Sequence, residues 1–383
     1  MSDPVYLDYA ATTPTDPRVA HQMGACLTVH GNFGNPASRS HAFGWQAEEA
    51  VESARAQMAK ALHADVREII WTSGATESDN LALKGPALAP GQTKRHIVTS
   101  AIEHKAVLDT CAYLETQGFE VTYLTPDAHG RVEASSVAQA LREDTLIVSV
   151  MHVNNELGTI NDVAAIGRIC RNKNVLFHVD AAQSFGKLEI NVESMCIDML
   201  SISAHKIYGP KGVGCLYVRR EPPIKMTPLF HGGGHEMGLR SGTLATHQVV
   251  GLGAAAELMV AHMHEEQVRL STLRQRFLRH IHQIPGCVEN SHPEHSLHAI
   301  VNLGFSGVDG ETLLLALDDL AVSSGSACTS ASVEPSYVLR AIGVPEEIAH
   351  ASLRFSFGRF TTEEEVDLAG RRVAEVVGRL RAP

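Results

Sequence analysis

Short apolar runs alternate with longer amphipathic stretches over the larger part of the chain. The short runs are rich in valine, isoleucine and leucine, and most of them end at polar residues, which is typical of strands buried on both faces. We expect strands at residues 68–73, 96–100, 120–124, 146–152, 176–180, 199–203 and 214–218.

Helical spacing characterises the stretches between several of these runs. In residues 45–62, Val51, Ala54, Met58 and Leu62 recur every three or four positions and would share one face of a helix. We expect further helices at residues 105–117, 135–141 and 163–172. Strands that alternate with helices indicate an α/β fold with a mostly parallel sheet, and ligands then bind at the carboxyl ends of the strands.

The pattern changes near Thr246. Residues 246–284 have the spacing of a long helix, broken at most once, and a strand, a helix, a second strand and a final helix follow at 299–305, 309–318, 353–358 and 362–381. This arrangement predicts a smaller α+β unit. We therefore expect an N-terminal segment of residues 1–14 that packs with the small domain, a large domain of residues 15–260 and a small C-terminal domain of residues 261–383.

Composition and charge narrow the functional classes. The 383 residues carry a formal charge of -11, which disfavours nonspecific binding to nucleic acid or to a membrane surface. We find neither an apolar run of the ~20 residues that a membrane span needs nor a signal-peptide pattern. The seven cysteines form no CxxC pair and no disulfide framework. We therefore expect a cytoplasmic protein with reduced cysteines and with no nucleic-acid or membrane partner.

Two charged residues close neighbouring apolar runs. Asp180 ends one predicted strand and Lys206 comes just after another, so both would lie at the same edge of the sheet. A partly desolvated lysine can form a Schiff base with an aldehyde, and a nearby carboxylate can pair with a pyridinium nitrogen. This pair predicts a pyridoxal 5'-phosphate site, and a structural salt bridge is the alternative.

Other polar residues also stand at predicted strand ends. Thr76 lies where a strand gives way to a helix and could bind phosphate, and Thr243 could be a second phosphate contact. His104 could stack on a flat ring and transfer protons, while Asn155 could bond a carboxylate or a phenolic oxygen. Taken singly, these residues are more often helix caps, structural histidines or turn formers. We expect no metal site, because the glycines between His231 and His235 favour a loop over aligned ligands.

A cysteine and an arginine complete the candidate chemistry. Cys328 lies in the small-residue segment 323–332, which favours an exposed and therefore reactive thiolate, although free cysteines are usually buried and inert. Arg354 stands among apolar residues of a predicted strand, where it could grip a substrate carboxylate in a bidentate manner. An arginine at the surface edge of the sheet is the alternative.

These segments together resemble the cysteine desulfurases, the fold-type I pyridoxal phosphate enzymes that supply sulfur for iron–sulfur clusters. The extended small-residue loop around Cys328 resembles that of the housekeeping class, which serves a scaffold protein. The similarity covers nearly the whole chain and is carried by residues 6–14, 34–38, 72–80, 103–105, 151–158, 203–212, 231–243, 323–332, 354–356 and 358–362.

The resemblance implies a role for each matching position. Lys206 would hold the cofactor covalently, His104 would stack on its ring and move protons, and Cys328 would accept the sulfur. The remaining contacts would go to the ring and its phenolic oxygen, to the phosphate and to the substrate carboxylate. Asp180 and Gln183 would contact the ring and its phenolic oxygen. The phosphate would be held by Ala75, Thr76, Ser203 and His205 of the same chain and by Thr243 of the partner subunit. The substrate would be bound by Asn155, Arg354 and Asn35.

The resemblance also implies a reaction. A homodimer would convert L-cysteine to L-alanine and leave a persulfide on Cys328, which would pass its sulfur to iron–sulfur cluster assembly and other transfer pathways. A selenocysteine lyase, a related aminotransferase and a catalytically inactive sulfur-transfer protein are the alternatives. Many relatives carry a further tail that docks the scaffold, and the sequence given ends at Pro383, so we expect scaffold docking to be either absent or of a different mode.

Overall fold

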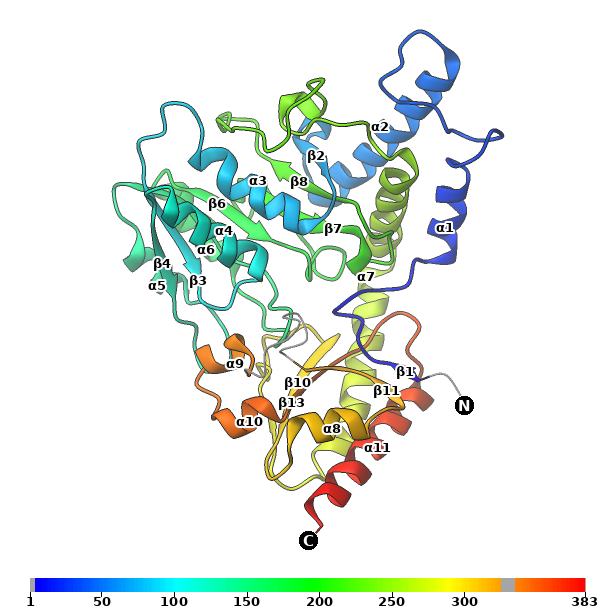
Figure 1. Cartoon of the computed structure of the whole chain (residues 1–383), viewed down its shortest axis with the longest axis vertical. Coiled ribbons are helices and arrows are strands. Elements are labelled where there is room, and N and C mark those ends of the chain that lie inside the picture. Colours follow the sequence, from blue (N-terminus) through cyan, green and yellow to red (C-terminus); the bar gives the residue numbers. More distant parts are fainter. Residues whose placement is uncertain (1–3, 325–334, 383) are drawn as a thin grey trace.

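A seven-stranded sheet forms the centre of the upper part of the molecule. The computed structural model describes residues 4–324 and 335–382, and Figure 1 shows the sheet with helices on both sides. Strand β8 runs antiparallel to both of its neighbours and the other pairs are parallel, so the predicted mostly parallel mixed sheet is confirmed. In spatial order the strands are β2 (Ile69–Thr72), β8 (Gly214–Val218), β7 (Met199–Ser203), β6 (Leu176–Asp180), β5 (Thr145–Ser149), β3 (His96–Ser100) and β4 (Glu120–Leu124).

Alternating side chains divide the two faces of this sheet. In β2, Ile69 and Trp71 join one buried cluster and Ile70 joins another, because successive side chains of a strand point to opposite faces. Helices α3 (Ala75–Ala87) and α4 (Lys105–Thr116) contribute to the cluster with Ile70. The opposite face is covered by α2 (Ala42–Leu62), α5 (Ala134–Ala140), α6 (Val163–Asn172) and the first part of α7 (Thr246–Ile281).

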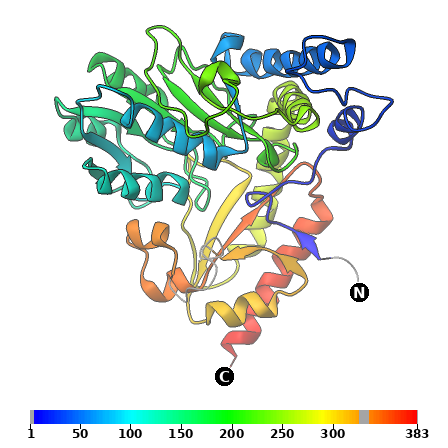
Figure 2. The same cartoon turned by 45° about the horizontal axis from the view of Figure 1, so that its top comes forward.

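A second, antiparallel sheet lies below the first (Figures 1 and 2). Its strands, in spatial order, are β12 (Ser323–Ser324), β13 (Ser352–Ser356), β10 (Ile300–Phe305) and β9 (Cys287–Glu289). Helix α11 (Glu363–Arg381) packs against α7 and α8 (Gly310–Ala316), and a capping box at Thr362 and Glu365 fixes its start. The two short helices α9 (Tyr337–Ala341) and α10 (Glu346–His350) also belong to this part.

The N-terminal segment joins the two parts of the molecule. Strand β1 (Val5–Tyr6) pairs in parallel with β11 (Leu320–Ala321), and the chain then rises to α1 (Pro17–Gly24), as Figure 1 shows. The division into residues 1–14, 15–260 and 261–383 stays a prediction. No helix in the two described ranges combines the length and the apolar content that a membrane crossing needs.

Helix α7 runs unbroken, so the break that the sequence allowed is absent. Its buried residues up to Met259 belong to the core of the large sheet, whereas those from Leu270 onward belong to the core of the second sheet. One continuous helix thus spans both cores.

The predicted strand 146–152 is shorter than expected and ends at Ser149.

Phe277 of α7 tests the second core. Its ring is fully buried and lies 4.9 Å from the ring centre of Phe355 and 5.5 Å from that of Phe357. Phe277→Ala should lower the free energy of unfolding by about 3–5 kcal/mol, because it removes apolar contacts and leaves a cavity. Urea denaturation measures this loss. Val268→Ala on the same helix, at a 56% exposed position, is the control, and an equal effect of both changes would contradict the prediction.

Candidate functional site

A pocket of about 540 Å³ lies where the carboxyl ends of the parallel strands face the second sheet. It brings together residues that are far apart in the sequence, as the strand-end argument predicts. The predicted site residues that line it are Ala75, Thr76, His104, Asn155, Asp180, Gln183, Ser203, His205, Lys206 and Arg354.

The amine of Lys206 is held by the N-terminal segment. Lys206 ends a short 3-10 turn directly after β7, and its Nζ donates to the carbonyl oxygens of Ala10, at 2.5 Å, and Ala11, at 2.9 Å. The backbone N–H of Thr13 also donates to the carbonyl of His205, at 2.8 Å. These bonds fix the N-terminal segment across the lysine and point its amine into the pocket.

Asp180 places a carboxyl group at the same edge of the sheet. It is 5% exposed, and its Oδ1 accepts from the backbone N–H of Ala182 at 2.8 Å. Burial raises the pKa of Asp180, while the neighbouring His104 and Lys206 oppose that shift. A buried carboxylate of this kind is stabilised by a cationic partner, which a protonated pyridine ring provides.

His104 both caps a helix and lines the pocket, two roles that the sequence left open. Its Nδ1 accepts from the backbone N–H of Ala106 at 3.1 Å, so the ring caps the first turn of α4. Because Nδ1 acts as an acceptor, the proton of the neutral ring lies on Nε2. His104 is therefore both a helix cap and a residue that lines the pocket.

The N-terminus of α3 forms another wall of the pocket. Its capping residue is Gly74, whose φ of 151° suits glycine, and no side chain caps the helix. The first N–H groups of α3, at Ala75 and Thr76, are thus free to face an anion. Nearby, burial and the charges of surrounding lysines lower the pKa of His205 to about 4, and its Nδ1 lies 3.1 Å from the hydroxyl of Thr12.

Arg354 reaches the pocket from β13. It is only 4% exposed, so the alternative of a surface-edge arginine is wrong. Its guanidinium donates to the carbonyl oxygen of Asn155 and to Oδ1 of Asp8, both at 2.8 Å. Within the described ranges, Nε of Arg354 and Oδ1 of Asn155 are buried without a hydrogen-bond partner. Such unpaired buried atoms favour a polar ligand, since leaving them unsatisfied costs free energy.

Three predicted residues are not placed in this pocket. Asn35 and Thr243 are exposed and do not line it, and Cys328 lies outside the described residues. The sequence reasoning did not assign Asp8, Ala10 and the rest of the N-terminal segment to the site. Their signal was present, because the stretch 6–14 was among the motifs that carried the resemblance.

The residues of this pocket fit pyridoxal phosphate. The uncapped end of α3 suits a phosphate, the lysine amine suits an aldehyde, and Asp180 suits a ring nitrogen. The unsatisfied Nε of Arg354 remains to donate to the carboxylate of an amino acid, and the unsatisfied Oδ1 of Asn155 remains to accept from an N–H or O–H group of the ligand. The site therefore offers partners for the cofactor and for an amino-acid substrate together.

Comparison with known proteins agrees with this geometry. Residues 5–368 match the family model of class-V aminotransferases. The cysteine desulfurase IscS of Pseudomonas aeruginosa (strain LESB58) is 59% identical over 381 residues, covering 100% of this chain and 94% of that protein.

Two solved structures agree in fold. A NifS-like protein has a TM-score of 0.91 at 38% identity over 98% of this chain and 100% of its own. SspA in complex with cysteine has a TM-score of 0.83 at 40% identity, over 93% of this chain and 99% of its own. The chain therefore belongs to the class-V aminotransferase family and, within it, to the cysteine desulfurases.

Proposed function

We propose that this chain is a pyridoxal phosphate-dependent cysteine desulfurase, which converts L-cysteine to L-alanine and transfers the sulfur to Cys328. The observation that carries the proposal is one pocket that unites the amine of Lys206, the carboxyl group of Asp180 and the guanidinium of Arg354. The 59% identity to a cysteine desulfurase over the whole chain supports the same activity, and the complex of the neighbour SspA with cysteine supports the substrate.

The cofactor contacts follow from the walls of the pocket. Bound pyridoxal phosphate supplies an aldehyde that reacts with amines and a ring that withdraws electrons from the substrate carbon. The Asp180 carboxylate accepts a hydrogen bond from the protonated ring nitrogen, and Gln183 donates an N–H to the phenolic oxygen. The N-terminus of α3 holds the phosphate together with Ser203 and His205, which is a neutral hydrogen-bonding group at pH 7 because its pKa lies near 4.

The substrate contacts come from both sheets. Arg354 and Asn155 bind the carboxylate of L-cysteine through their N–H groups, among them the buried Nε of Arg354, which has no hydrogen-bond partner in the described part of the chain. Asp8 and the carbonyl of Asn155 keep the guanidinium in place. Lys206 moves the proton of the α-carbon, and His104 presents its Nε2–H to the same space.

The described residues on either side of the segment that carries Cys328 are attached to a residue of the pocket at one end and to residues beside the pocket at the other. On one side Ser323 pairs with Arg354 in the ladder between β12 and β13. On the other side the hydroxyl of Ser336 donates to Glu156 at 2.5 Å, and Tyr337 donates to the carbonyl of Glu103 at 2.6 Å. These attachments support the proposal that the Cys328 thiolate attacks the substrate sulfur.

The sulfur transfer balances without an external oxidant. A bond forms between Sγ of Cys328 and the substrate sulfur while the bond between that sulfur and the substrate β-carbon breaks. The carbon keeps the electron pair and is protonated, which yields L-alanine, and the enzyme keeps a persulfide. We propose that this persulfide supplies iron–sulfur cluster assembly in the cytoplasm, through a scaffold protein or another acceptor.

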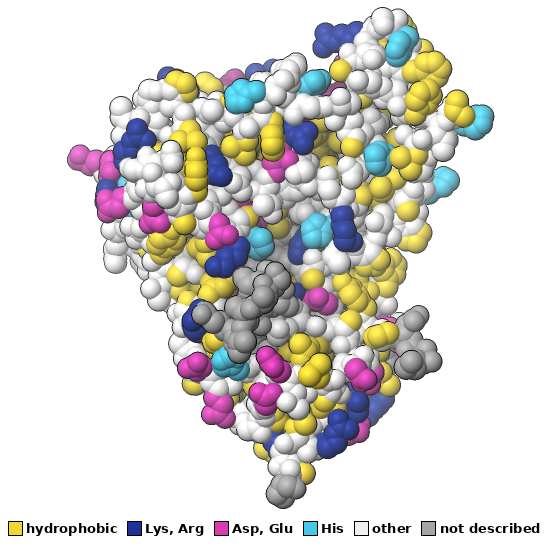
Figure 3. Space-filling view, viewed as in Figure 1, with side chains coloured by type: hydrophobic (Ala, Val, Ile, Leu, Met, Phe, Trp, Pro, Cys, Tyr) yellow, Lys and Arg dark blue, Asp and Glu magenta, His cyan; other side chains and the backbone are white. Residues whose placement is uncertain are grey.

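A homodimer completes the site in this proposal. Asn35 and Thr243 lie on exposed segments outside the pocket of their own chain, and Thr243 of the partner subunit would reach the phosphate. Figure 3 shows apolar side chains gathered on the projecting corner formed by α1 and α2. The exposed large apolar residues between the end of α1 and the first turn of α2 are Leu27, Val29, Phe33, Phe43 and Trp45. A second copy of the chain would cover them.

Lys206 is tested by the colour of the protein. Lys206→Ala should not develop the visible absorption band that wild-type protein shows after addition of pyridoxal phosphate, because the amine that reacts with the aldehyde is gone. Absorption spectroscopy after gel filtration measures the band. Lys211→Ala, at an exposed lysine of the same pocket, is the control and should stay coloured. A band that survives in Lys206→Ala would refute the assignment.

Cys328 is tested by the products. Wild-type protein incubated with L-cysteine and a reductant should release sulfide and alanine in equal amounts. Cys328→Ser should keep the visible band but form neither product above background, because the sulfur acceptor is lost. Cys196→Ser, at a half-buried cysteine outside the pocket, should behave like wild type. Normal turnover of Cys328→Ser would remove this residue from the reaction, and transamination without sulfide would favour an aminotransferase.

The dimer is tested at its proposed apolar surface. Trp45→Glu places a charge on a side chain that is 55% exposed in the single chain and should shift the protein from dimer to monomer in analytical ultracentrifugation. Loss of alanine formation should accompany the shift, since the partner contact of Thr243 is lost as well. Leu315→Glu, on α8 at 78% exposure, is the matched control. A dimeric Trp45→Glu variant would place the interface elsewhere.

A further inference from the structure

The side-chain amide of Gln183 is held on two sides. It is 4% exposed; its Nε2 donates to the carbonyl oxygen of Ala10 at 2.8 Å, and its Oε1 accepts from Nζ of Lys187 at 3.3 Å. The two ends of an amide have nearly the same shape, so its partners decide which end faces which way. An ammonium group only donates and a carbonyl oxygen only accepts, so Lys187 and Ala10 select the same orientation, in which the amide nitrogen faces Ala10 and the amide oxygen faces Lys187.

Lys187 itself is placed by α7. Its backbone carbonyl accepts from Nε2 of Gln267 at 2.5 Å. The preceding Gly186 has a φ of 73°, and a Cβ built on it would lie 2.8 Å from Cβ of Met259, so only glycine lets the two segments approach this closely. Helix α7 thus fixes the segment from which Lys187 reaches Gln183.

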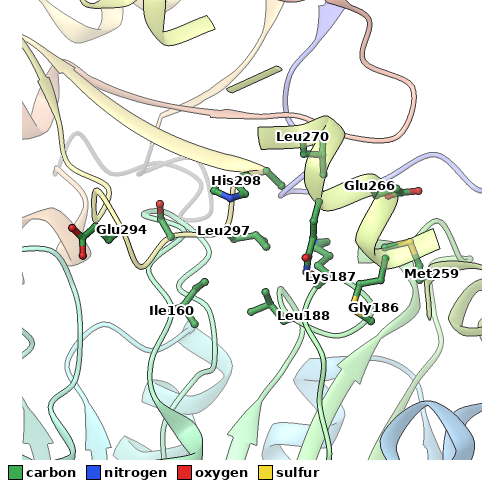
Figure 4. Close-up of a pocket in the computed structure, with 14 residues that line it drawn as sticks. Ile160, Gly186, Lys187, Leu188, Met259, Glu266, Leu270, Glu294, Leu297 and His298 are labelled. Atoms are coloured by element: carbon green, nitrogen blue, oxygen red, sulfur yellow. The ribbon is translucent and has the colours of Figure 1, made fainter. Parts of the chain in front are cut away.

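The side chain of Lys187 passes along a cavity of about 200 Å³ between the two parts of the molecule. Figure 4 shows Lys187 beside Leu188, with Glu266 and Leu270 of α7 along the same cavity. Burial and the charge of Lys206 lower the pKa of Lys187 to about 7, while Glu266 raises it. The carboxylate of Glu266 is bound by Arg359. In the described ranges, Gln183 Oε1 is the one side-chain acceptor that Lys187 reaches.

We propose that Lys187 is a positioning residue for Gln183, which turns the amide N–H groups of that glutamine toward the phenolic oxygen of the bound cofactor. An amide nitrogen carries two N–H groups, of which one is bound to Ala10 and the second serves the cofactor oxygen. Lys187 does not line the pocket itself and affects the cofactor only by orienting the amide of Gln183. The inference rests on the proposed function, because it requires pyridoxal phosphate beside Gln183.

The test is a pH titration of the visible band in the protein loaded with pyridoxal phosphate. Lys187→Met removes the donor and the charge and leaves the bond to Ala10 to hold the amide, so the amide N–H is presented less firmly and the phenolic oxygen becomes more basic. The proton on the Lys206 nitrogen is then held more tightly, and the spectral change should move upward by about one pH unit, a tenfold change in proton affinity typical of a lost hydrogen bond to a charged group. Lys187→Arg keeps a donor and should titrate closer to wild type.

A double variant separates positioning from a direct effect of charge. If Lys187 acts through Gln183, then Lys187→Met should shift the titration of wild-type protein but not that of Gln183→Leu, because the amide is already absent. Lys173→Met, which changes an exposed lysine on the surface, should leave the titration unchanged.

Three outcomes separate the proposals. An unchanged titration of Lys187→Met, or equal shifts with and without Gln183, would overturn the inference while the proposed function stands. Absence of a visible band in wild-type protein would instead overturn the proposed function. If Lys187→Met does not fold, the same cycle with Lys187→Gln, which also removes the charge, decides between these outcomes.

Discussion

The N-terminal segment that crosses between the two sheets is the constraint on which the site depends. After β1 has paired with β11, the carboxylate of Asp8 binds Arg354, and the carbonyl oxygens of Ala10 and Ala11 accept from Lys206. One short piece of backbone therefore sets the position of an arginine on the second sheet relative to a lysine on the first. A substrate that uses both groups is bound only because this segment holds them in register.

Burial of charge shapes the chemistry at the edge of the large sheet. The carboxyl groups of Asp79, Glu103 and Asp180 are buried near one another, and burial raises the pKa of each. His178, whose Nε2 lies 3.6 Å from Oδ1 of Asp79, is neutral, because burial lowers its pKa to about 3. Within the described ranges, His178 thus supplies no positive charge to these acids, and a cationic ring at Asp180 would stabilise its carboxylate in addition to His104 and Lys206. The preference for a protonated pyridine is built into the sheet itself.

Several further contacts connect the pocket to the second part of the molecule. Arg354 comes from β13, and Ser336 and Tyr337 bind residues beside the pocket just after the segment that contains Cys328. Helix α7 contributes Gln267, which holds the backbone of Lys187 behind Gln183. A shift of the second sheet would therefore change the positions of the groups that contact the substrate, the cysteine segment and the cofactor ring at the same time.

Most of the large sheet was predictable from the sequence. Its strands are short apolar runs between helices, and the local spacing of side chains is enough to identify them. The polar residues at their ends, including Asp180 and Lys206, could be assigned to one pocket because parallel strands share an edge. Where the strand 146–152 was drawn too long, the apolar run continued past Ser149 into a buried segment, and apolar character alone does not distinguish the two.

The sequence by itself determined the residue types and the order in which strand ends deliver them. Only the tertiary structure decided which groups meet across the two sheets, such as Asp8 with Arg354 and Lys187 with Gln183. It also decided that α7 stays unbroken, since its two halves are buried in different cores. The physical reason is that spacing along a chain reports on local backbone geometry, whereas contacts between distant segments depend on how separate buried surfaces pack together.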